Sequence, residues 1–262
     1  PPTNDISCLY LQATWDYSEL SMNSEEELEL VLKEQKPARG WEHLDEGYLA
    51  TIPNLAGITL NGYFYENTRL AGANLCGAIL QGSFCNTDFS YAILANADLS
   101  FADIQMSGFG RANLRDANLV LARAEFADFV SACLSNARML SIVATSCDFD
   151  LADLSGADMT LGRFVRARFV GASLKEARLR SALLVRANMT DADLKDAGLR
   201  NADLSGCDFT GAYLEGAAIQ GAIASYSTSF LGAVMPNGER YRERDESPQE
   251  TLDRYRVPEL DE

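Results

Sequence analysis

The sequence predicts an all-β solenoid, a rod in which each coil of the chain has four short sides. From Phe84 to position 224 an apolar residue, usually a large one, recurs at every fifth position. A small residue, mostly Ala, stands two places before it. A spacing of five matches neither a helix, whose apolar face repeats every 3.6 residues, nor a half-buried strand, which repeats every two.

A second period, of twenty residues, lies within the first. Four sides of five residues make one coil, so residues twenty apart stack along the rod at about 4.8 Å, the spacing of neighbouring strands. The small residues also point inward, which predicts that Cys147 and Cys207 are buried. Ala124 and Ala144 stand at large positions and Ile142 at a small one, so we expect a locally weaker core there. The clearest column is the core ladder Phe89, Phe109, Phe129, Phe149, Phe169 and Phe209, with Met189 in the same series.

Three regions follow in chain order. Residues 1–52 form an N-terminal capping segment with a short helix at about 24–35, since Ser24 and Glu27 make a capping box. This helix either covers the first coil or is a solvated acidic helix. Residues 53–235 form the solenoid, of about nine coils, with an irregularity near 81–87 because Leu80 and Phe84 are only four apart. Residues 236–262 form a charged, flexible tail, with a short helix at about 250–256 as the alternative.

The repeated pattern A-(D/N)-L-x-x resembles that of the pentapeptide-repeat family. It stands, for example, at Ala97-Asp98-Leu99, Ala152-Asp153-Leu154 and Ala202-Asp203-Leu204, and the resemblance covers roughly residues 53–235. The stretch GAVMPNGE (232–239) is similar to the usual end of such repeats. The resemblance implies a right-handed quadrilateral β-helix.

The net charge of −16 is concentrated at the two ends of the chain. Residues 1–54 carry 11 acidic and 3 basic side chains, whereas the solenoid region is nearly balanced. Direct binding to nucleic acid is therefore not expected, because phosphate binding needs a cationic surface. No apolar run is long enough to span a membrane. The six cysteines form no metal or disulfide pattern, which indicates reduced thiols and a cytoplasmic location.

The sequence offers no catalytic, cofactor-binding, small-molecule or metal site. There is a single histidine, His43, which we interpret as structural, so a multi-histidine metal site is excluded. Asp148, Asp150 and Asp153 lack the spacing of a calcium loop. We interpret them as turn residues whose carboxylates bind the backbone of their own turns.

Two sets of outward-facing residues depart from the repeat and are candidate interaction residues. An apolar stripe on a soluble protein commonly marks a docking surface. Burial of this stripe under the chain's own termini, and simple tolerance, are the alternatives. The arginine cluster is expected to bind an acidic partner or the acidic ends of the chain, a solvated surface being the alternative. The apolar set is Phe101, Met106, Leu121, Phe126, Leu140 and Leu161; the basic set is Arg163, Arg166, Arg178, Arg180, Arg186 and Arg200, with Arg168 beside them.

These observations predict a non-enzymatic, rod-shaped protein-interaction or scaffold module that binds a partner protein or a second copy. The alternative comes from the family resemblance, because some pentapeptide-repeat proteins are acidic rods that occupy the DNA site of gyrase. Such a DNA mimic needs acidic residues along the rod, whereas here the acid lies mainly at the ends.

Overall fold

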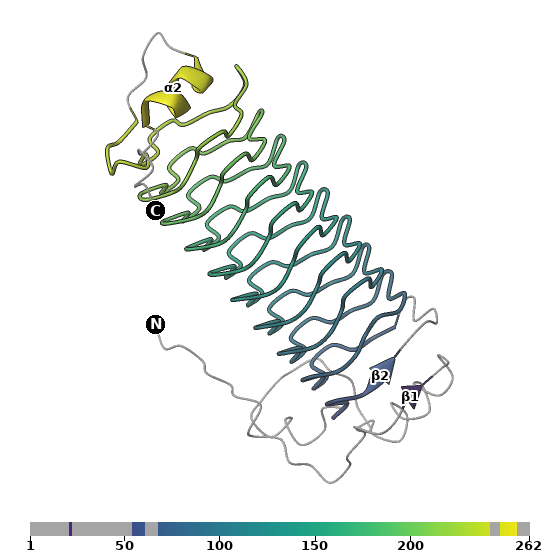
Figure 1. The fold of residues 1–262 in the computed structure, drawn as a ribbon. Coiled ribbons are helices and arrows are strands. Elements are labelled where there is room, and N and C mark those ends of the chain that lie inside the picture. Colours follow the sequence, from purple (N-terminus) through teal and green to yellow (C-terminus); the bar gives the residue numbers. More distant parts are fainter. Residues whose placement is uncertain (1–20, 23–53, 61–67, 242–246, 256–262) are drawn as a thin grey trace, which may run out of the picture.

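The computed structural model describes residues 21–22, 54–60, 68–241 and 247–255 of the 262-residue chain. These residues form an elongated rod of stacked four-sided coils with one helix at its C-terminal end (Figure 1). The helix expected at 24–35 and the rest of the expected N-terminal cap, except residues 21–22, lie outside the described residues.

Parallel β-bridges join residues of neighbouring coils and define four faces of the rod. Most bridged pairs are twenty residues apart, as Asp103 and Arg123 are. Each coil therefore has four sides, and each side is a short bridged segment followed by a two-residue turn. We name the faces in chain order by their bridge ladders: face A runs from Asn54 to Val234, face B from Thr59 to Ala218, face C from Ser83 to Ile223 and face D from Arg69 to Ser229.

Two places depart from the twenty-residue step. Bridges across residues 81–83 join residues only nineteen apart, such as Ile79 and Asp98, because the side between Leu80 and Phe84 is one residue short. Bridges across residues 224–228 join residues twenty-one apart, such as Tyr213 and Val234. The ladders continue through both places, so the coils absorb one deleted and one inserted residue without losing register.

Phenylalanine rings twenty residues apart stack inside the rod. The ring centroids of Phe109 and Phe129 lie 4.8 Å apart, and the rings are nearly parallel. The stack is continuous from Phe89 to Phe169, and its rings are fully buried. Close aromatic pairs add about 0.5–1.5 kcal/mol beyond the burial of their area. This column therefore contributes strongly to the stability of the rod.

Small polar side chains on the inner surface satisfy backbone carbonyl groups. The Ser107 Oγ donates to the Phe84 carbonyl at 2.6 Å, the Cys147 Sγ to the Ala124 carbonyl at 2.7 Å, and the Cys207 Sγ to the Leu184 carbonyl at 2.8 Å. Cys147 and Cys207 are fully buried, which confirms the prediction. This burial raises the pKa of both thiols from 9.0 to about 12.

In the core behind face C, one side of a coil has its large residue at the position that is usually small, and its small residue at the position that is usually large. On one side Ile142 occupies the small position and Ala144 the large one, and both are fully buried. On the next coil Gly162 and Phe164 occupy the small and large positions, and the Phe164 ring lies against the glycine. Total side-chain volume is what a core must conserve. The weaker core expected at Ala124, Ile142 and Ala144 stays a prediction; the structure adds that Ile142 and Ala144 exchange the large and small positions within one side.

The turns at the four corners have a common geometry. Their second residue has a positive φ, for example 59° at Asn96 and 57° at Asp116. The carboxylate before the turn accepts a backbone N–H within it, as Asp98 does from Ser100 at 3.0 Å and Asp148 from Asp150 at 2.9 Å. This confirms that the repeated aspartates are turn residues.

Each end of the coil stack carries an added element. Strand β1 (Ser21–Met22) pairs in parallel with β2 (Thr59–Leu60) at the N-terminal end. Helix α2 (Pro248–Tyr255) lies at the C-terminal end, where Leu252 and Tyr255 are buried (Figure 1). The Gln249 side chain accepts the Ala224 N–H at 2.9 Å. The sequence predicts a charged, flexible tail from residue 236, with a short helix at about 250–256 as the alternative; over 248–255 the structure has the helix, packed on the last coil.

A capping box starts α2. The Ser247 N–H donates to Glu250 Oε2 at 2.6 Å, and the Glu250 N–H donates to Ser247 Oγ at 3.3 Å. The backbone and side-chain hydrogen bonds from Ser247 lower the pKa of Glu250. Such reciprocal bonds satisfy N–H groups that a helix start otherwise leaves unpaired.

The cysteines differ in part from the expectation of six reduced thiols. Cys76 is disulfide-bonded, so the expectation is wrong at that position. Cys85, Cys133, Cys147 and Cys207 are thiols and form no disulfide bonds. The one described helix, α2, is too short and too polar to cross a membrane, and no other described segment is a membrane-spanning helix.

Candidate interaction face

Face C carries exposed apolar side chains along both of its edges. At the edge shared with face B the exposed residues are Phe101, Leu121 and Leu161. At the edge shared with face D they are Met106 and Phe126. Phe101 and Phe126 have 66% and 64% of their surface exposed. Large exposed apolar groups therefore line both edges of face C.

Leu140 extends the edge with face B. It is partly exposed, and its carbonyl accepts the N–H of Leu121 at 3.0 Å, so the two residues lie on adjacent coils. The sequence-predicted apolar residues therefore fall into two columns on the two sides of face C.

These apolar side chains lie at turn positions with a positive φ, a backbone conformation that Gly and Asn adopt more easily. Phe101, Met106, Leu121, Phe126 and Leu161 all have φ between 57° and 62°. A positive φ brings the Cβ of an ordinary residue close to its own carbonyl and costs about 1–2 kcal/mol, whereas Gly and Asn adopt it more easily. Five of the seven large apolar or aromatic residues with a positive φ in the described chain lie on the edges of face C. The other two, Tyr91 and Leu151, lie on the corner between faces D and A.

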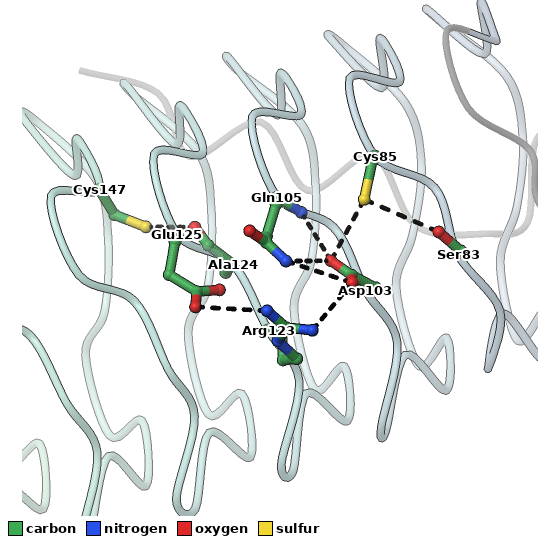
Figure 2. Close-up of polar contacts among 8 residues, drawn as sticks. All are labelled: Ser83, Cys85, Asp103, Gln105, Arg123, Ala124, Glu125 and Cys147. Carbon is green, nitrogen blue, oxygen red and sulfur yellow. Dashed lines mark hydrogen bonds and ion pairs between the residues drawn. The ribbon is translucent and has the colours of Figure 1, made fainter.

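A polar network occupies the centre of face C in its N-terminal half (Figure 2). Asp103 accepts hydrogen bonds from the Cys85 thiol at 3.3 Å and from Gln105 Nε2 at 2.9 Å. Arg123 lies 3.4 Å from Asp103 Oδ2 and 3.8 Å from Glu125 Oε1. The charge of Arg123 is thus neutralised within the face, and the apolar edges border a centre that is largely satisfied internally.

Glu125 retains one unsatisfied oxygen. Its Oε2 atom is buried and has no hydrogen-bond partner among the described residues. Cys147 lies on the next coil behind it, and the carboxylate charge of Glu125 adds to the burial that raises the pKa of the Cys147 thiol (Figure 2). A buried acceptor without a donor costs about 1–3 kcal/mol.

The C-terminal half of face C has a different character. Its central ladder runs from Val143 through Arg163 to Leu183 by parallel bridges. Val165 and Val185 stand in the turns beside this ladder, and their carbonyls accept the N–H groups of Ser146 and Arg166 at 2.9 Å. These aliphatic side chains are partly exposed, and Leu183 is exposed.

The predicted arginine cluster is divided between the two edges of face C. Arg166 and Arg186 stand on adjacent coils at the edge with face D, and Arg163 lies in the central ladder. Across the face, Arg180 and Arg200 stand at the edge with face B. Arg178 belongs to the ladder of face B. The structure does not bring these six residues into one patch.

Only some of the arginines are neutralised. Arg168, on face D, pairs with both Asp148 and Asp150, and the hydrogen bond that its guanidinium donates to Asp150 raises its pKa. The Arg200 Nε donates to Gln220 Oε1 at 3.2 Å. Within the described part of the chain, no carboxylate lies at ion-pairing distance from Arg163, Arg166, Arg178, Arg180 or Arg186.

No constellation for chemistry appears among the residues that the structure describes. They contain no group of three or more metal-ligating side chains. His43 lies outside the described residues. Asp148 and Asp153, which lack the spacing of a calcium loop, accept hydrogen bonds from backbone N–H groups of their own turns. Asp153, for example, accepts the Ser155 N–H at 3.0 Å.

Three solved structures of similar sequence are relevant, and the first of them also agrees with this geometry. The solved structure of HetL, a pentapeptide repeat protein from the cyanobacterium Nostoc sp. strain PCC 7120, is 26% identical and matches with a TM-score of 0.58, covering 76% of this chain and all of HetL. Full-length QnrB1, a plasmid-mediated fluoroquinolone resistance protein, is 22% identical over 61% of this chain and 92% of its own, with a TM-score of 0.30. Rfr23 from the cyanobacterium Cyanothece 51142 is 26% identical over 61% of this chain and 89% of its own, with a TM-score of 0.20.

A search of curated proteins finds no match to this chain. The family model for pentapeptide repeats matches in eight copies, at residues 68–107, 109–139, 147–186 and 187–223, which is more than half of the chain. The structures of this family imply a right-handed quadrilateral β-helix. With four bridge ladders, a twenty-residue coil and this match, the chain belongs to the pentapeptide-repeat family.

Proposed function

We propose that this protein is a non-enzymatic, rod-shaped binding module that docks a partner protein on face C. The observation that carries the proposal is the placement of large apolar residues at exposed, positive-φ corners on both edges of this one face. The fold does not need a large apolar side chain at these positions, because Gly, Asn, Asp and Ser occupy equivalent positions at other corners.

In the free protein, the corner residues Phe101 and Phe126 combine backbone strain with exposed apolar surface. Each of Phe101 and Phe126 costs about 1 kcal/mol in backbone strain relative to Asn or Gly, and each leaves about two thirds of its surface exposed. Burying such a ring against a partner would contribute about 1.5–3 kcal/mol. Aromatic residues of this kind are enriched among residues that dominate binding energy at protein interfaces.

The likeness to HetL supports a role of this type. HetL is described as a pentapeptide repeat protein involved in the regulation of heterocyst differentiation. A regulator can act by binding alone, and a rigid rod with one apolar face suits that mode of action. The family is generally non-catalytic, which agrees with a binding role for this chain.

The gyrase-binding DNA mimic is the weaker candidate for this chain. It is favoured by the net charge of −16. A mimic of a phosphate backbone needs a continuous acidic face, whereas face C carries unneutralised arginines and face D is interrupted by Arg168. A supercoiling assay with purified gyrase and a fluoroquinolone tests it: protection by this protein at stoichiometric concentration would favour the mimic over the docking rod.

A pair of matched variants tests the docking face. Phe101→Asn/Phe126→Asn removes two apolar groups from face C, and Leu151→Asn makes the same change at a corner away from it. Wild-type and variant proteins would be cross-linked in a lysate of the native host, and captured proteins compared. A partner retained by wild type and Leu151→Asn but lost from the double variant is expected. Equal capture by all three, with the double variant correctly folded, would refute the proposal.

Self-association is measured with the same variants. Sedimentation velocity of the wild type against Leu121→Glu shows whether the partner is a second copy. A dimer that Leu121→Glu dissociates would identify face C as a homotypic interface. A monomer in both cases leaves a different protein as the occupant.

A further inference from the structure

We propose that the C-terminal half of face C binds an acidic amphipathic segment of the partner, one with carboxylates next to aliphatic side chains. The inference rests on the proposed docking function and specifies the chemistry of what docks. It concerns the coils from Val143 to Arg186, not the N-terminal half with its phenylalanines.

The first step is the apolar strip in this half. Val143 and Leu183 lie in the central ladder, separated by Arg163, and Val165 and Val185 flank them in the turns. All four are at least partly exposed. Aliphatic side chains in such an arrangement favour contact with Leu, Ile or Val of another chain, because burying each one removes apolar area from water.

The second step is the charge around this strip. The dipeptide Val-Arg occurs twice, at 165–166 and 185–186, one coil apart. The Arg166 N–H donates to the Val185 carbonyl at 2.9 Å, so the two arginines project from adjacent turns of the same edge. Stacked rings in the core place adjacent coils 4.8–5.0 Å apart. Two like charges at this spacing repel each other, and an anion between them would relieve the repulsion.

The arginines of this patch lack the ion pairs that neighbouring arginines form with described residues. Arg123 on the same face is paired with Asp103 and Glu125, and Arg168 on the next face is paired with Asp148 and Asp150. For Arg163, Arg166 and Arg186, the described residues provide no carboxylate within ion-pairing distance. Within the described part of the rod, carboxylates therefore pair with the arginines beside this patch but not with the arginines in it.

A protein segment fits this patch better than a membrane or a nucleic acid. Both of those present anionic charge over a long surface, which would also meet Glu125 and Asp103 farther along the same face. A short segment can be confined to three coils. A helix lying along the rod rises about 5.4 Å per turn, close to the coil spacing, so carboxylates three or four residues apart would face successive arginines.

A selection experiment tests the inference without knowledge of the partner. A random peptide library displayed on phage is selected against the full-length protein, and selected peptides are measured by fluorescence anisotropy. The test variant is Arg166→Gln/Arg186→Gln. The matched control is Arg138→Gln/Arg178→Gln, which removes two exposed arginines from face B; among the described residues, no carboxylate lies at ion-pairing distance from either.

The expected result is enrichment of peptides that combine Asp or Glu with Leu, Ile or Val. Their affinity should fall about tenfold for each arginine removed, or about a hundredfold in the test variant, since each loses a charge-assisted hydrogen bond. The control should change affinity less than threefold. Thermal melting of each variant shows that the fold is retained.

Other outcomes overturn the inference in distinguishable ways. Peptides that lose binding in Phe101→Asn/Phe126→Asn but not in the arginine variant would refute the acidic segment and leave the docking face standing. Peptides indifferent to both changes would refute both. Binding of the wild type to phosphatidylglycerol vesicles that is lost in Arg166→Gln/Arg186→Gln would assign the patch to a lipid surface instead.

Discussion

Replacing Gly162 by Ala should destabilise the protein, although Ala is the usual residue in this column of the repeat. Ala102, Ala122, Ala182 and Ala202 hold the corresponding positions on other coils. Gly162 does not have a positive φ, so its backbone would accept Ala, and by that argument alone the change would stabilise the fold by about 0.4–1 kcal/mol.

The steric effect opposes this gain and is larger. A Cβ at residue 162 would overlap Cε2 of Phe164 and lie 2.9 Å from its Cζ and 3.0 Å from the Met159 carbonyl oxygen. The Phe164 ring cannot swing away freely, because it packs edge-on between Phe149 at 6.1 Å and Phe169 at 5.8 Å. Overpacking of a core costs about 1–3 kcal/mol. The net expectation is a loss of about 0.5–2 kcal/mol.

A double-mutant cycle measures this coupling. The second change is Phe164→Leu, which restores the Ala-x-Leu pair present at Ala182 and Leu184. Urea denaturation followed by circular dichroism gives the midpoint and slope of each variant. Gly162→Ala/Phe164→Leu should be more stable than the sum of the two single changes predicts, by about 0.5–3 kcal/mol. If Gly162→Ala alone unfolds at the same or a higher urea concentration than wild type, the volume argument for this part of the core is wrong.

Further predictions follow from the corners, the thiols and the C-terminal helix. Phe126→Asn should raise the free energy of unfolding by up to about 1 kcal/mol, since Asn accepts the positive φ of this corner, and a lower denaturation midpoint would contradict the strain. The buried thiols of Cys147 and Cys207 keep their protons up to about pH 12 in the folded state, whereas unfolded thiols ionise near pH 9. Stability should therefore fall as the pH rises from 9 to 12, by up to about 1.4 kcal/mol per pH unit for each thiol, and less steeply in Cys147→Ala/Cys207→Ala. Removing residues 242–262 takes away α2 and leaves the last coil uncovered, so sedimentation should show self-association that rises with concentration.

The core and the ladders could be predicted from spacing because side-chain direction repeats with the backbone. The period of twenty places Phe109 under Phe129, and their rings stack. The four-residue interval from Leu80 to Phe84 coincides with the bridges that join residues nineteen apart. Spacing alone treats each column independently, however, and so misses the exchange of volume between Ile142 and Ala144 within one side.

The surface was only partly predictable, because neighbours in sequence are not neighbours on the rod. The period of twenty places Phe101 and Leu121 in one column, and they do lie on one edge of face C. The same period separates Arg166 from Arg178, which lie on different parts of the rod despite being close in sequence. Which arginines pair with carboxylates depends on the side-chain conformations of neighbours on adjacent coils, and the repeat does not determine those.

The C-terminal helix shows a different limit. The tail carries many charges and few apolar residues, which is typical of a disordered segment. Leu252 and Tyr255, three residues apart, are enough to pack α2 because the end of the solenoid already presents an apolar surface. A helix that depends on an existing surface rather than on its own composition can be indicated by the sequence only as an alternative to disorder, as it is here for residues 250–256.

The corner residues are informative about binding because local contacts explain some of them and not others. Tyr91 has a positive φ, but Arg111 donates to its hydroxyl at 3.1 Å and lies 5.7 Å from its ring centre. Leu151 lies against Gly171, whose missing side chain leaves room for it. Among the described residues no ring or guanidinium group stacks on Phe101 or Phe126. Within the described residues, no aromatic or cationic contact of the kind found at Tyr91 offsets the strain at those two corners, and burial against the proposed partner would do so.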